Sequence, residues 1–372
     1  MPIGVVFLIA LALSLSMQLE LPASTGSYTV GRTIFRWMDS SRPEVLTDNP
    51  NDVREVIALV WYPAVQGTGT KDGYFPGLSA VSKALVESGE VAMWEVLGLQ
   101  LIRSNSYFDA EPVRNQGSFP VVLLLPGNGT NIEFYASLAS EIASHGYVVV
   151  GINHPYDVAA IELASGSVAL YDKNQWSLDA NVHQVYTAER IKVKTADVLF
   201  ALDQFKIINA DANSPFAGIL DLNAVAVAGH SLGGITASEA CKADKRFKAC
   251  VNLDGLQAGG PFSTDVTATP PEQSFLFLTK ESQLPPKLIE KFESTSQSYW
   301  VVIHSASHDS FTDGPQLQPS LLPLPNQADR IMVLIQNYTL AFLDQTLKGQ
   351  LANLLSNSVD GQDVSVKVFP SR

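Results

Sequence analysis

VAVAGHSLGGITA, residues 225–237, passes from an unbroken apolar run through a glycine-rich turn into a second apolar segment. The run before the turn predicts a buried strand, and the segment after it predicts a helix. Gly229, Ser231 and Gly233 fit the pattern G-x-S-x-G. Such a tight turn needs small residues on both sides of the serine, because larger side chains would collide with neighbouring backbone. The pattern therefore predicts that Ser231 is a nucleophile held at the carboxyl edge of a sheet, beside the positive end of a helix.

The elements around this turn alternate between strands and helices. The strands are continuous runs rich in Val, Ile and Leu, which is typical of parallel strands covered on both faces. Two earlier β-rich runs flank a turn and predict an antiparallel start. We therefore expect an α/β-hydrolase fold, with a mostly parallel central sheet, helices on both faces and an antiparallel N-terminal start. The expected strands are 28–39, 54–64, 119–127, 147–155, 223–231, 247–255, 273–281 and 299–306, and the expected helices are 131–146, 186–206, 233–243, 285–294 and 327–348.

A catalytic base is expected after the serine, because this fold orders its triad as Ser, then an acid, then His. Of the six histidines, only His304 and His308 follow Ser231 near the last predicted strand. His304 falls within the strand, where the sheet fixes its direction, and is interpreted as a core or near-site residue. His308 lies in the loop SASHDSF just past the strand, where it can fold over the serine. We therefore predict His308 as the general base.

Two residues are candidates for the acid that orients the histidine. Asp254 ends the predicted strand that follows the nucleophile helix, and Glu281 ends the next strand. Either carboxylate could hold the imidazole in its reactive tautomer. A permissive glycine follows Asp254 in the stretch NLDG, which favours it over Glu281.

An oxyanion hole is predicted in the stretch LLLPGNGTN, which follows the apolar strand at 119–125. Gly127 and Gly129 bracket Asn128, and such a turn lets a backbone N–H approach the substrate carbonyl. The expected donors are the backbone N–H groups of Asn128 and Leu232.

Composition excludes some classes of partner. The chain has 372 residues, of which 46% are hydrophobic, and its formal net charge is −13. That length and apolar content allow a large core. The acidic balance disfavours nucleic acid. The histidines and cysteines lack metal-ligand spacing, so we expect neither a metal nor any other cofactor.

The N-terminal segment 1–20 is predicted to be a signal peptide or an apolar N-terminal segment, and 21–372 the hydrolase domain. An unbroken apolar run from Val5 to Leu13 precedes small residues suited to a signal peptidase, although Lys and Arg are absent before it. We therefore expect an exported protein. Cys241 and Cys250 are interpreted as two buried or half-buried thiols, with one local disulfide as the alternative. Within the domain, 78–105 is a candidate apolar cap helix.

Four stretches together resemble the platelet-activating-factor acetylhydrolase-like group of α/β-hydrolases. They are the segment from PVVLLLPGNGTN to INHPYD, then GHSLGG, VNLDG and IHSASHDSFTD. The resemblance runs from about residue 24 to 350. It implies Ser231 as nucleophile, Asp254 as acid, His308 as base, and Asn128 and Leu232 as oxyanion donors. It also implies calcium-independent hydrolysis of short or oxidised acyl chains at the sn-2 position of phospholipids.

The expected function is therefore a serine carboxylic-ester hydrolase of the acetylhydrolase type. Its partners would be a small ester or phospholipid substrate and, transiently, a lipid surface. A broad short-chain carboxylesterase or polyester hydrolase is the alternative within enzymes. A hydrolase fold used only for binding is the alternative outside them, although an intact Ser, acid and His order favours the enzyme.

Overall fold

A computed structural model of the chain describes residues 20–89, 91–174, 178–255, 272–281, 297–317 and 327–369. The predicted signal segment, apart from Glu20, and the helix expected at 285–294 lie outside these residues.

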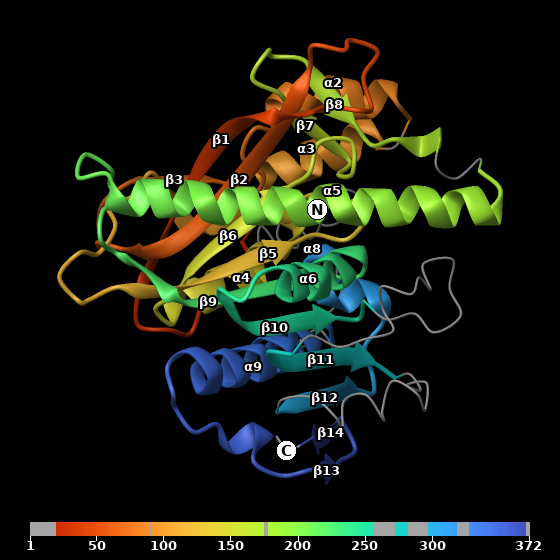
Figure 1. Cartoon of the computed structure of the whole chain (residues 1–372). Helices are drawn as coiled ribbons and strands as arrows, with labels where there is room; N and C mark the ends of the chain where they lie inside the picture. Colours follow the sequence, from red (N-terminus) through yellow and green to blue (C-terminus); the bar gives the residue numbers. More distant parts are fainter. Residues whose placement is uncertain are drawn as a thin grey trace, which may run out of the picture.

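Twelve of the described strands form one twisted sheet, in the order β13-β14-β12-β11-β10-β9-β5-β6-β2-β1-β4-β3 (Figure 1). The six central strands, from β12 to β6, all run parallel. β1 and β2 pair antiparallel with each other, and β2 pairs antiparallel with β6, so the expected antiparallel start is confirmed. The strand bounds are β1 Thr29–Pro43, β2 Val53–Ala64, β3 Thr70–Gly73, β4 Arg103–Phe108, β5 Phe119–Leu125, β6 Val148–Asn153, β9 Leu220–His230, β10 Phe247–Leu253, β11 Ser274–Lys280, β12 Ser298–Ile303, β13 Val359–Asp360 and β14 Val364–Phe369.

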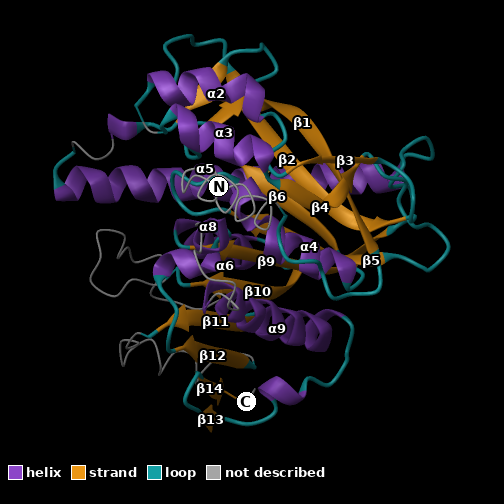
Figure 2. Ribbon diagram, turned by 180° about the vertical axis from the view of Figure 1, so that it is seen from behind, coloured by secondary structure: helices purple, strands orange, loops and turns teal. Residues whose placement is uncertain are grey.

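Helices cover both faces of this sheet. α5 (Ala180–Ala210) and α6 (Leu232–Ala243) lie in front of it in Figure 1. α4 (Ala136–Ser144) and α9 (Gln327–Leu347) lie on the opposite face, which Figure 2 brings forward. The predicted α/β-hydrolase architecture is therefore confirmed.

The central strands alternate their side chains between two cores. In β5, Val121 and Leu123 pack in the core under α5 and α6, while Val122 and Leu124 pack in the core under α4 and α9. Because successive strand residues point to opposite faces, a strand covered on both sides has to be apolar throughout. This double burial fixes the sheet from which the site loops emerge.

The candidate cap at 78–105 is not one helix. α2 (Leu78–Glu87) ends at Ser88 and Gly89, where Gly89 has a φ of +75°. α3 (Met93–Leu101) follows, and the chain then enters β4, which lies between β1 and the edge strand β3. A glycine in the left-handed region is a common helix stop, and it breaks the continuous helix expected here. Whether these helices act as a cap stays a prediction.

Edge elements were missing from the sequence-based prediction. β3, for which no strand was expected, pairs with β4. At the other edge, β14 pairs antiparallel with β12. A small separate hairpin, β7 (Ala160–Glu162) with β8 (Val168–Leu170), projects near α2. All of these strands are short, and β3 and β14 pair with strands that lie far from them in the chain.

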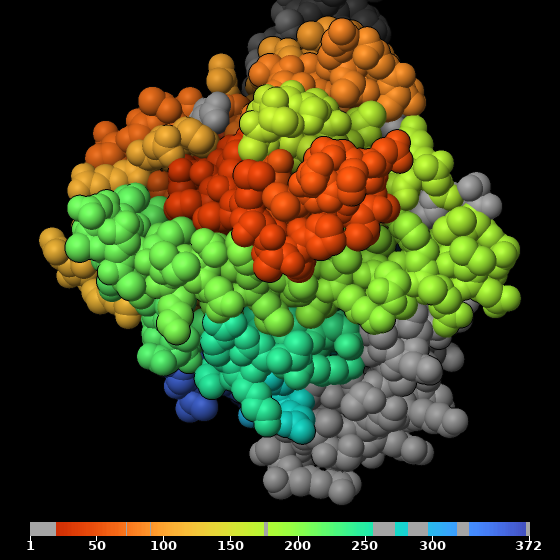
Figure 3. Space-filling model, turned by 45° about the horizontal axis from the view of Figure 1, so that its top comes forward, coloured from red at the N-terminus to blue at the C-terminus, as the bar shows by residue number. Residues whose placement is uncertain are grey.

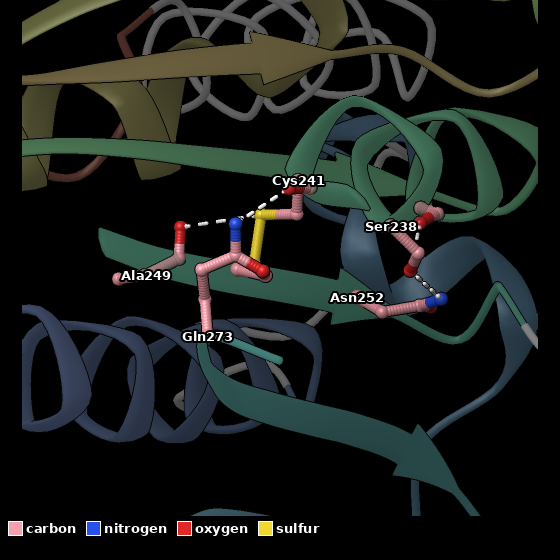
Figure 4. Close-up of a disulfide and its surroundings, with 7 residues drawn as sticks. Ser238, Cys241, Ala249, Asn252 and Gln273 are labelled. Atoms are coloured by element: carbon pink, nitrogen blue, oxygen red, sulfur yellow. Dashed lines mark hydrogen bonds between the residues drawn. A yellow bond between two sulfur atoms is a disulfide. The ribbon is translucent and has the colours of Figure 1, made fainter. Parts of the chain in front are cut away.

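Cys241 and Cys250 form a disulfide, so the interpretation as two separate thiols was wrong and the local alternative holds. The bond joins the C-terminal turn of α6 to β10 (Figure 4). Both side chains are buried, and the amide of Gln273 donates to the carbonyl of Cys241. Nearer the site, the amide of Asn252 donates to Ser238 at 3.4 Å. The helix that follows Ser231 is thus joined covalently to the neighbouring strand.

Candidate active site

Ser231 stands on a sharp turn between β9 and α6. Its backbone has φ +54° and ψ −122°, which a non-glycine residue rarely adopts. A Cβ on Gly229 would overlap the carbonyl of Gly233. One on Gly233 would come within 2.5 Å of the carbonyl oxygens of Leu125 and Pro126. The glycines of the G-x-S-x-G pattern are therefore required by close backbone approach.

The structure brings Ser231, His308 and Asp254 together at the carboxyl ends of three different strands. Nε2 of His308 lies 3.0 Å from Oγ of Ser231. Nδ1 of the same ring lies 2.6 Å from Oδ2 of Asp254. The His308 side chain is 28% exposed and that of Asp254 only 3%. A buried carboxylate thus orients a histidine that substrate and water can reach.

The two competing residues lie elsewhere. Glu281 is exposed at the end of β11, and its carboxylate is not among the groups that contact His308. His304 comes directly after β12 rather than inside it, and its Nε2 lies 2.8 Å from Oγ of Ser365 in β14. The geometry therefore singles out Asp254 and His308 from the candidate pairs.

Asp254 shares the unusual backbone of Ser231, with a φ of +49°. Its N–H donates to the carbonyl of Leu278 at 2.8 Å, and the next N–H, of Gly255, donates to Oδ1 of Asn252 at 2.7 Å. These bonds hold a residue that an unsupported chain would place in an extended or right-handed conformation.

The turn after β5, residues 126–130, lies against Ser231, and we call it the oxyanion turn after its predicted role. A Cβ on Gly127 would be 3.4 Å from Cβ of Ser231. Beyond it, the side-chain amide of Asn128 donates to the hydroxyl of Tyr171 at 2.8 Å, and the N–H of Gly129 donates to the carbonyl of Asp157 at 2.8 Å. Leu232 is the first residue of α6, so its N–H belongs to the open end of that helix. The two segments that carry the predicted oxyanion donors therefore both adjoin Ser231, and the role of their N–H groups stays a prediction.

The turn His308–Phe311, which we call the histidine turn, is connected to the start of α4 through Asp313, two residues further on. Its carboxylate accepts from the N–H of Ser137 at 3.2 Å and from the hydroxyl of Tyr74 at 3.0 Å, and its own N–H donates to the carbonyl of Phe134 at 2.7 Å. Complete burial raises the pKa of Asp313 to about 7, against the hydrogen bonds, which lower it. This carboxyl therefore titrates near neutral pH inside the fold.

His230 is buried beside the base. Its ring centroid lies 4.6 Å from that of His308, and its Nδ1 lies 2.9 Å from the hydroxyl of Tyr135. Burial, followed by the charge of His308, lowers the pKa of His230 to about 3. His230 is thus neutral at physiological pH.

A hollow of about 740 Å³ opens beside the oxyanion turn. Its wall includes Tyr171, whose hydroxyl accepts the amide hydrogen bond from Asn128. Figure 3 shows its two borders, the connection between β1 and β2 in orange-red and the 156–174 segment in yellow-green. Among the residues described, no group of His, Cys, Asp or Glu could hold a metal ion, and no helix is long and apolar enough to cross a membrane.

Sequence reasoning missed Tyr135, Tyr171 and Asp313. Tyr135 lies in the stretch 131–146, predicted only as a helix, and Asp313 lies five residues past the predicted base. Their contacts form only when the chain folds, and no local sequence pattern reports them. His154, which follows β6, is buried with its Nδ1 2.8 Å from Oδ2 of Asp197.

Fold comparison defines the class of protein. A solved structure described as a ferulic acid esterase from Streptomyces cinnamoneus aligns with a TM-score of 0.68 and 22% identity, covering 94% of this chain and 99% of that one. At that identity the likeness shows the fold alone, and the fold is that of the α/β-hydrolases.

The particular family follows from the sequence. A family profile described as "Platelet-activating factor acetylhydrolase, isoform II" matches residues 13–363, and the chain belongs to this family. A platelet-activating factor acetylhydrolase of Cavia porcellus is 24% identical over 88% of this chain and 78% of its own length. A probable 1-alkyl-2-acetylglycerophosphocholine esterase of Arthroderma benhamiae is 27% identical over 72% and 67%. The predicted resemblance is confirmed, and the chain is an ester hydrolase.

Proposed function

We propose that the chain hydrolyses short-acyl esters through a covalent acyl-enzyme on Ser231. The observation that carries the proposal is the chain of contacts from Ser231 Oγ to His308 Nε2 at 3.0 Å and from His308 Nδ1 to Asp254 at 2.6 Å. A serine hydroxyl is a weak nucleophile until a base removes its proton, and this arrangement supplies the base and fixes its tautomer.

Each catalytic step has a residue for it. Ser231 Oγ bonds to the acyl carbon while its proton passes to His308 Nε2, and the carbonyl oxygen becomes an oxyanion held by the N–H groups of Asn128 and Leu232. His308 returns the proton to the leaving alkoxide as the ester bond breaks. Water then gives a proton to His308 and attacks the acyl carbon, and Ser231 recovers its proton as the carboxylic acid leaves. Asp254 stabilises the imidazolium in both halves.

The substrate class we infer is an acetyl or similarly short acyl ester, including such esters at the sn-2 position of phospholipids. Support comes from the family, whose relatives are described as acetylhydrolases and as a 1-alkyl-2-acetylglycerophosphocholine esterase.

The test is hydrolysis of p-nitrophenyl esters from acetyl to palmitoyl. We expect turnover to be highest for acetyl and butyryl, and Ser231→Ala to lower kcat about 10⁴-fold or more. Ser238→Ala, in the same helix but outside the triad, is the matched control and should keep its activity. A flat or long-chain profile that depends on Ser231 contradicts the short-acyl preference. Activity that survives in Ser231→Ala contradicts the nucleophile.

We further infer that the protein docks transiently on lipid through the outer face of α3. Four large apolar side chains there are exposed, with Trp94 at 73%. The net charge of −13 disfavours anionic membranes and leaves zwitterionic lipid as the surface. The set is Met93, Trp94, Leu97 and Leu101.

Co-sedimentation with phosphatidylcholine vesicles tests this surface. Trp94→Ser with Leu97→Ser should weaken binding, because both apolar contacts are lost together. Val333→Ser, an exposed apolar residue on α9, is the matched control and should bind as the wild type does. Equal binding by all three proteins contradicts a lipid contact at α3.

We also propose that the protein is exported from the cytoplasm. The Cys241–Cys250 disulfide supports it, because such bonds persist mainly in oxidising compartments. N-terminal sequencing of the mature protein should then begin at Met17, after the small residues Ser14 and Ser16. A mature chain that retains Val5 to Leu13 contradicts cleavage.

A further inference from the structure

We propose that Tyr135 and His230 act as a positioning pair that holds the oxyanion turn and the histidine turn in register around Ser231. The inference rests on the proposed function and assigns two further residues to the same site. Neither residue touches the reacting atoms.

Tyr135 joins two segments through one buried oxygen. It is completely buried at the end of the short 3-10 turn η1 (Ile132–Tyr135) that leads into α4. The N–H of Gly127 donates to its hydroxyl oxygen at 2.9 Å, and His230 Nδ1 lies 2.9 Å from the same oxygen. Gly127 directly precedes the predicted oxyanion donor Asn128, so the tyrosine holds the peptide group one residue before the one that carries that donor.

His230 carries the link to the base. Besides its 4.6 Å contact with the His308 ring, its ring stacks on Phe311, with centroids 5.7 Å apart and an interplanar angle of 17°. His308 and Phe311 begin and end the same turn. His230 therefore contacts the histidine turn with its ring faces and the oxyanion turn through Tyr135.

The space between these groups is filled. A Cβ on Gly127 would stand 3.3 Å from both His230 Nδ1 and the Tyr135 hydroxyl, and 3.4 Å from Ser231 Cβ. A small shift of the tyrosine or the histidine therefore moves the Gly127 peptide against the nucleophile. Hydrogen-bond donors in an oxyanion hole lose much of their effect when they are displaced, because they act on charge that exists only in the transition state.

The neutral form of His230 is compatible with its position beside the ring of His308. During the reaction His308 becomes an imidazolium, and a second positive ring at 4.6 Å would oppose that charge. The hydroxyl of Tyr135 can both accept from Gly127 and bond to a neutral imidazole, because it has one donor and two acceptor positions.

The first test is Tyr135→Phe, which removes only the oxygen. We expect kcat to fall about 10- to 100-fold with KM nearly unchanged, because the loss falls on the transition state. The affinity for a short-chain trifluoromethyl ketone, which forms a tetrahedral adduct with a serine nucleophile, should fall by the same factor. Tyr62→Phe in β2 is the matched control, since it removes another buried hydroxyl. That hydroxyl donates to the carbonyl of Ala110 at 2.7 Å. It should leave both readouts at the wild-type level.

A second pair of variants keeps the test decisive if Tyr135→Phe folds poorly. His230→Asn keeps a polar atom near the position of Nδ1, whereas His230→Gln moves it toward Nε2. We expect His230→Asn to stay close to wild type and His230→Gln to lose kcat and ketone affinity. Where Tyr135→Phe folds, combining it with His230→Gln should lose no more than the larger single change, because both break one link.

Wild-type kcat and ketone affinity in Tyr135→Phe overturn the inference, as does a loss confined to KM. Equal losses in His230→Asn and His230→Gln overturn it as well. The Ser231→Ala control separates this failure from failure of the proposed function. If ester hydrolysis requires Ser231 and these variants are silent, only the positioning pair is wrong.

Discussion

At the scale of single residues, the site depends on backbone conformations that are costly by themselves. Ser231 and Asp254 both have positive φ, at +54° and +49°. Each such residue costs about 1–3 kcal/mol and persists only where its surroundings hold it. Two of the three proposed triad members are held in this way, by backbone hydrogen bonds to neighbouring strands. The site is thus fixed by the sheet edge more than by its own side chains.

Asp313 gives a pH dependence of stability that has a defined sign. Its pKa is raised from 3.8 to about 7 in the fold, so the folded chain binds the proton more tightly than the unfolded chain. Its contribution is complete below the unfolded pKa and is lost as the pH rises toward 7. From pH 5 to pH 8 this loss is about 2–3 kcal/mol.

Urea unfolding of the wild type and of Asp313→Asn at pH 5 and pH 8 measures this loss. The wild type should lose stability relative to the variant as the pH rises, because asparagine does not titrate. If the free energy of unfolding of the wild type, relative to that of Asp313→Asn, stays constant or rises from pH 5 to pH 8, the raised pKa at Asp313 is contradicted.

Single site residues could be predicted from the sequence where a motif or the chain order of the triad identifies them. Ser231 was predicted from G-x-S-x-G, and His308 from chain order and its place after the last parallel strand. Asp254 was favoured over Glu281 because a permissive glycine follows it, and the 2.6 Å contact between Asp254 and His308 supports that choice. Tyr135 was beyond sequence reasoning, since its partners Gly127 and His230 meet it only in the folded chain.

At the scale of elements, the strand-to-helix turn tolerates little change. Gly233→Ala would press a methyl group within 2.5 Å of two backbone carbonyl oxygens, so we expect a loss of about 2–4 kcal/mol of stability. Gly98→Ala in α3 is the matched control, because nothing lies within 4 Å of its added Cβ and its backbone is helical. It should be neutral or gain about 0.5–1 kcal/mol. Equal thermal midpoints for the two variants contradict the close approach at Gly233.

The disulfide between α6 and β10 gives a second prediction at this scale. It closes a loop with a sequence separation of 9, for which the chain-entropy relation gives about 2–3 kcal/mol. Cys241→Ser with Cys250→Ser should lose that much in urea unfolding, and reduction of the wild type should reproduce the loss. A variant as stable as the oxidised wild type contradicts a closed bond.

Strands and helices were predicted correctly where the spacing of apolar residues in the sequence matches the faces that are buried. The six central parallel strands were all expected, because a strand buried on both faces is apolar throughout. The errors fell near the two edges of the sheet: the candidate cap helix at 78–105 is interrupted at Gly89, and β3, β4 and β14 were missed. β4 and β14 are only partly buried, so their apolar patterns are weaker than those of the central strands.

At the scale of the whole molecule, a buried ion cluster fastens the long helix α5 to the sheet. Arg54 at the start of β2 donates to Asp197 of α5 at 2.8 Å and to Glu44 at 2.7 Å. His154, after β6, reaches the same Asp197 carboxylate. Burial by itself would raise the pKa of Asp197. The cluster outweighs this effect, chiefly through the charge of Arg54, and holds the pKa of Asp197 far below its usual range.

Asp197→Asn should therefore cost about 3–5 kcal/mol at neutral pH, because it leaves buried positive charge without its partner. Asp203→Asn removes a carboxylate that is 59% exposed and paired with Arg246, and should cost about 1 kcal/mol or less. Since the depressed pKa contributes stability only above the unfolded value, the wild-type advantage over Asp197→Asn should shrink below about pH 4. Equal urea midpoints for the two variants at pH 7 contradict a stabilising role for the cluster.

The central claim is that His308 activates Ser231 as the nucleophile. The most direct measurement is reaction with diethyl p-nitrophenyl phosphate, in which the serine oxygen bonds to phosphorus and p-nitrophenolate leaves. The account predicts about one p-nitrophenolate released per chain, a diethylphosphoryl group mapped to Ser231 by peptide mass spectrometry, and a rate about 10²–10⁴-fold lower in His308→Ala. An adduct on another residue, or labelling of Ser231 at the wild-type rate without His308, would contradict it.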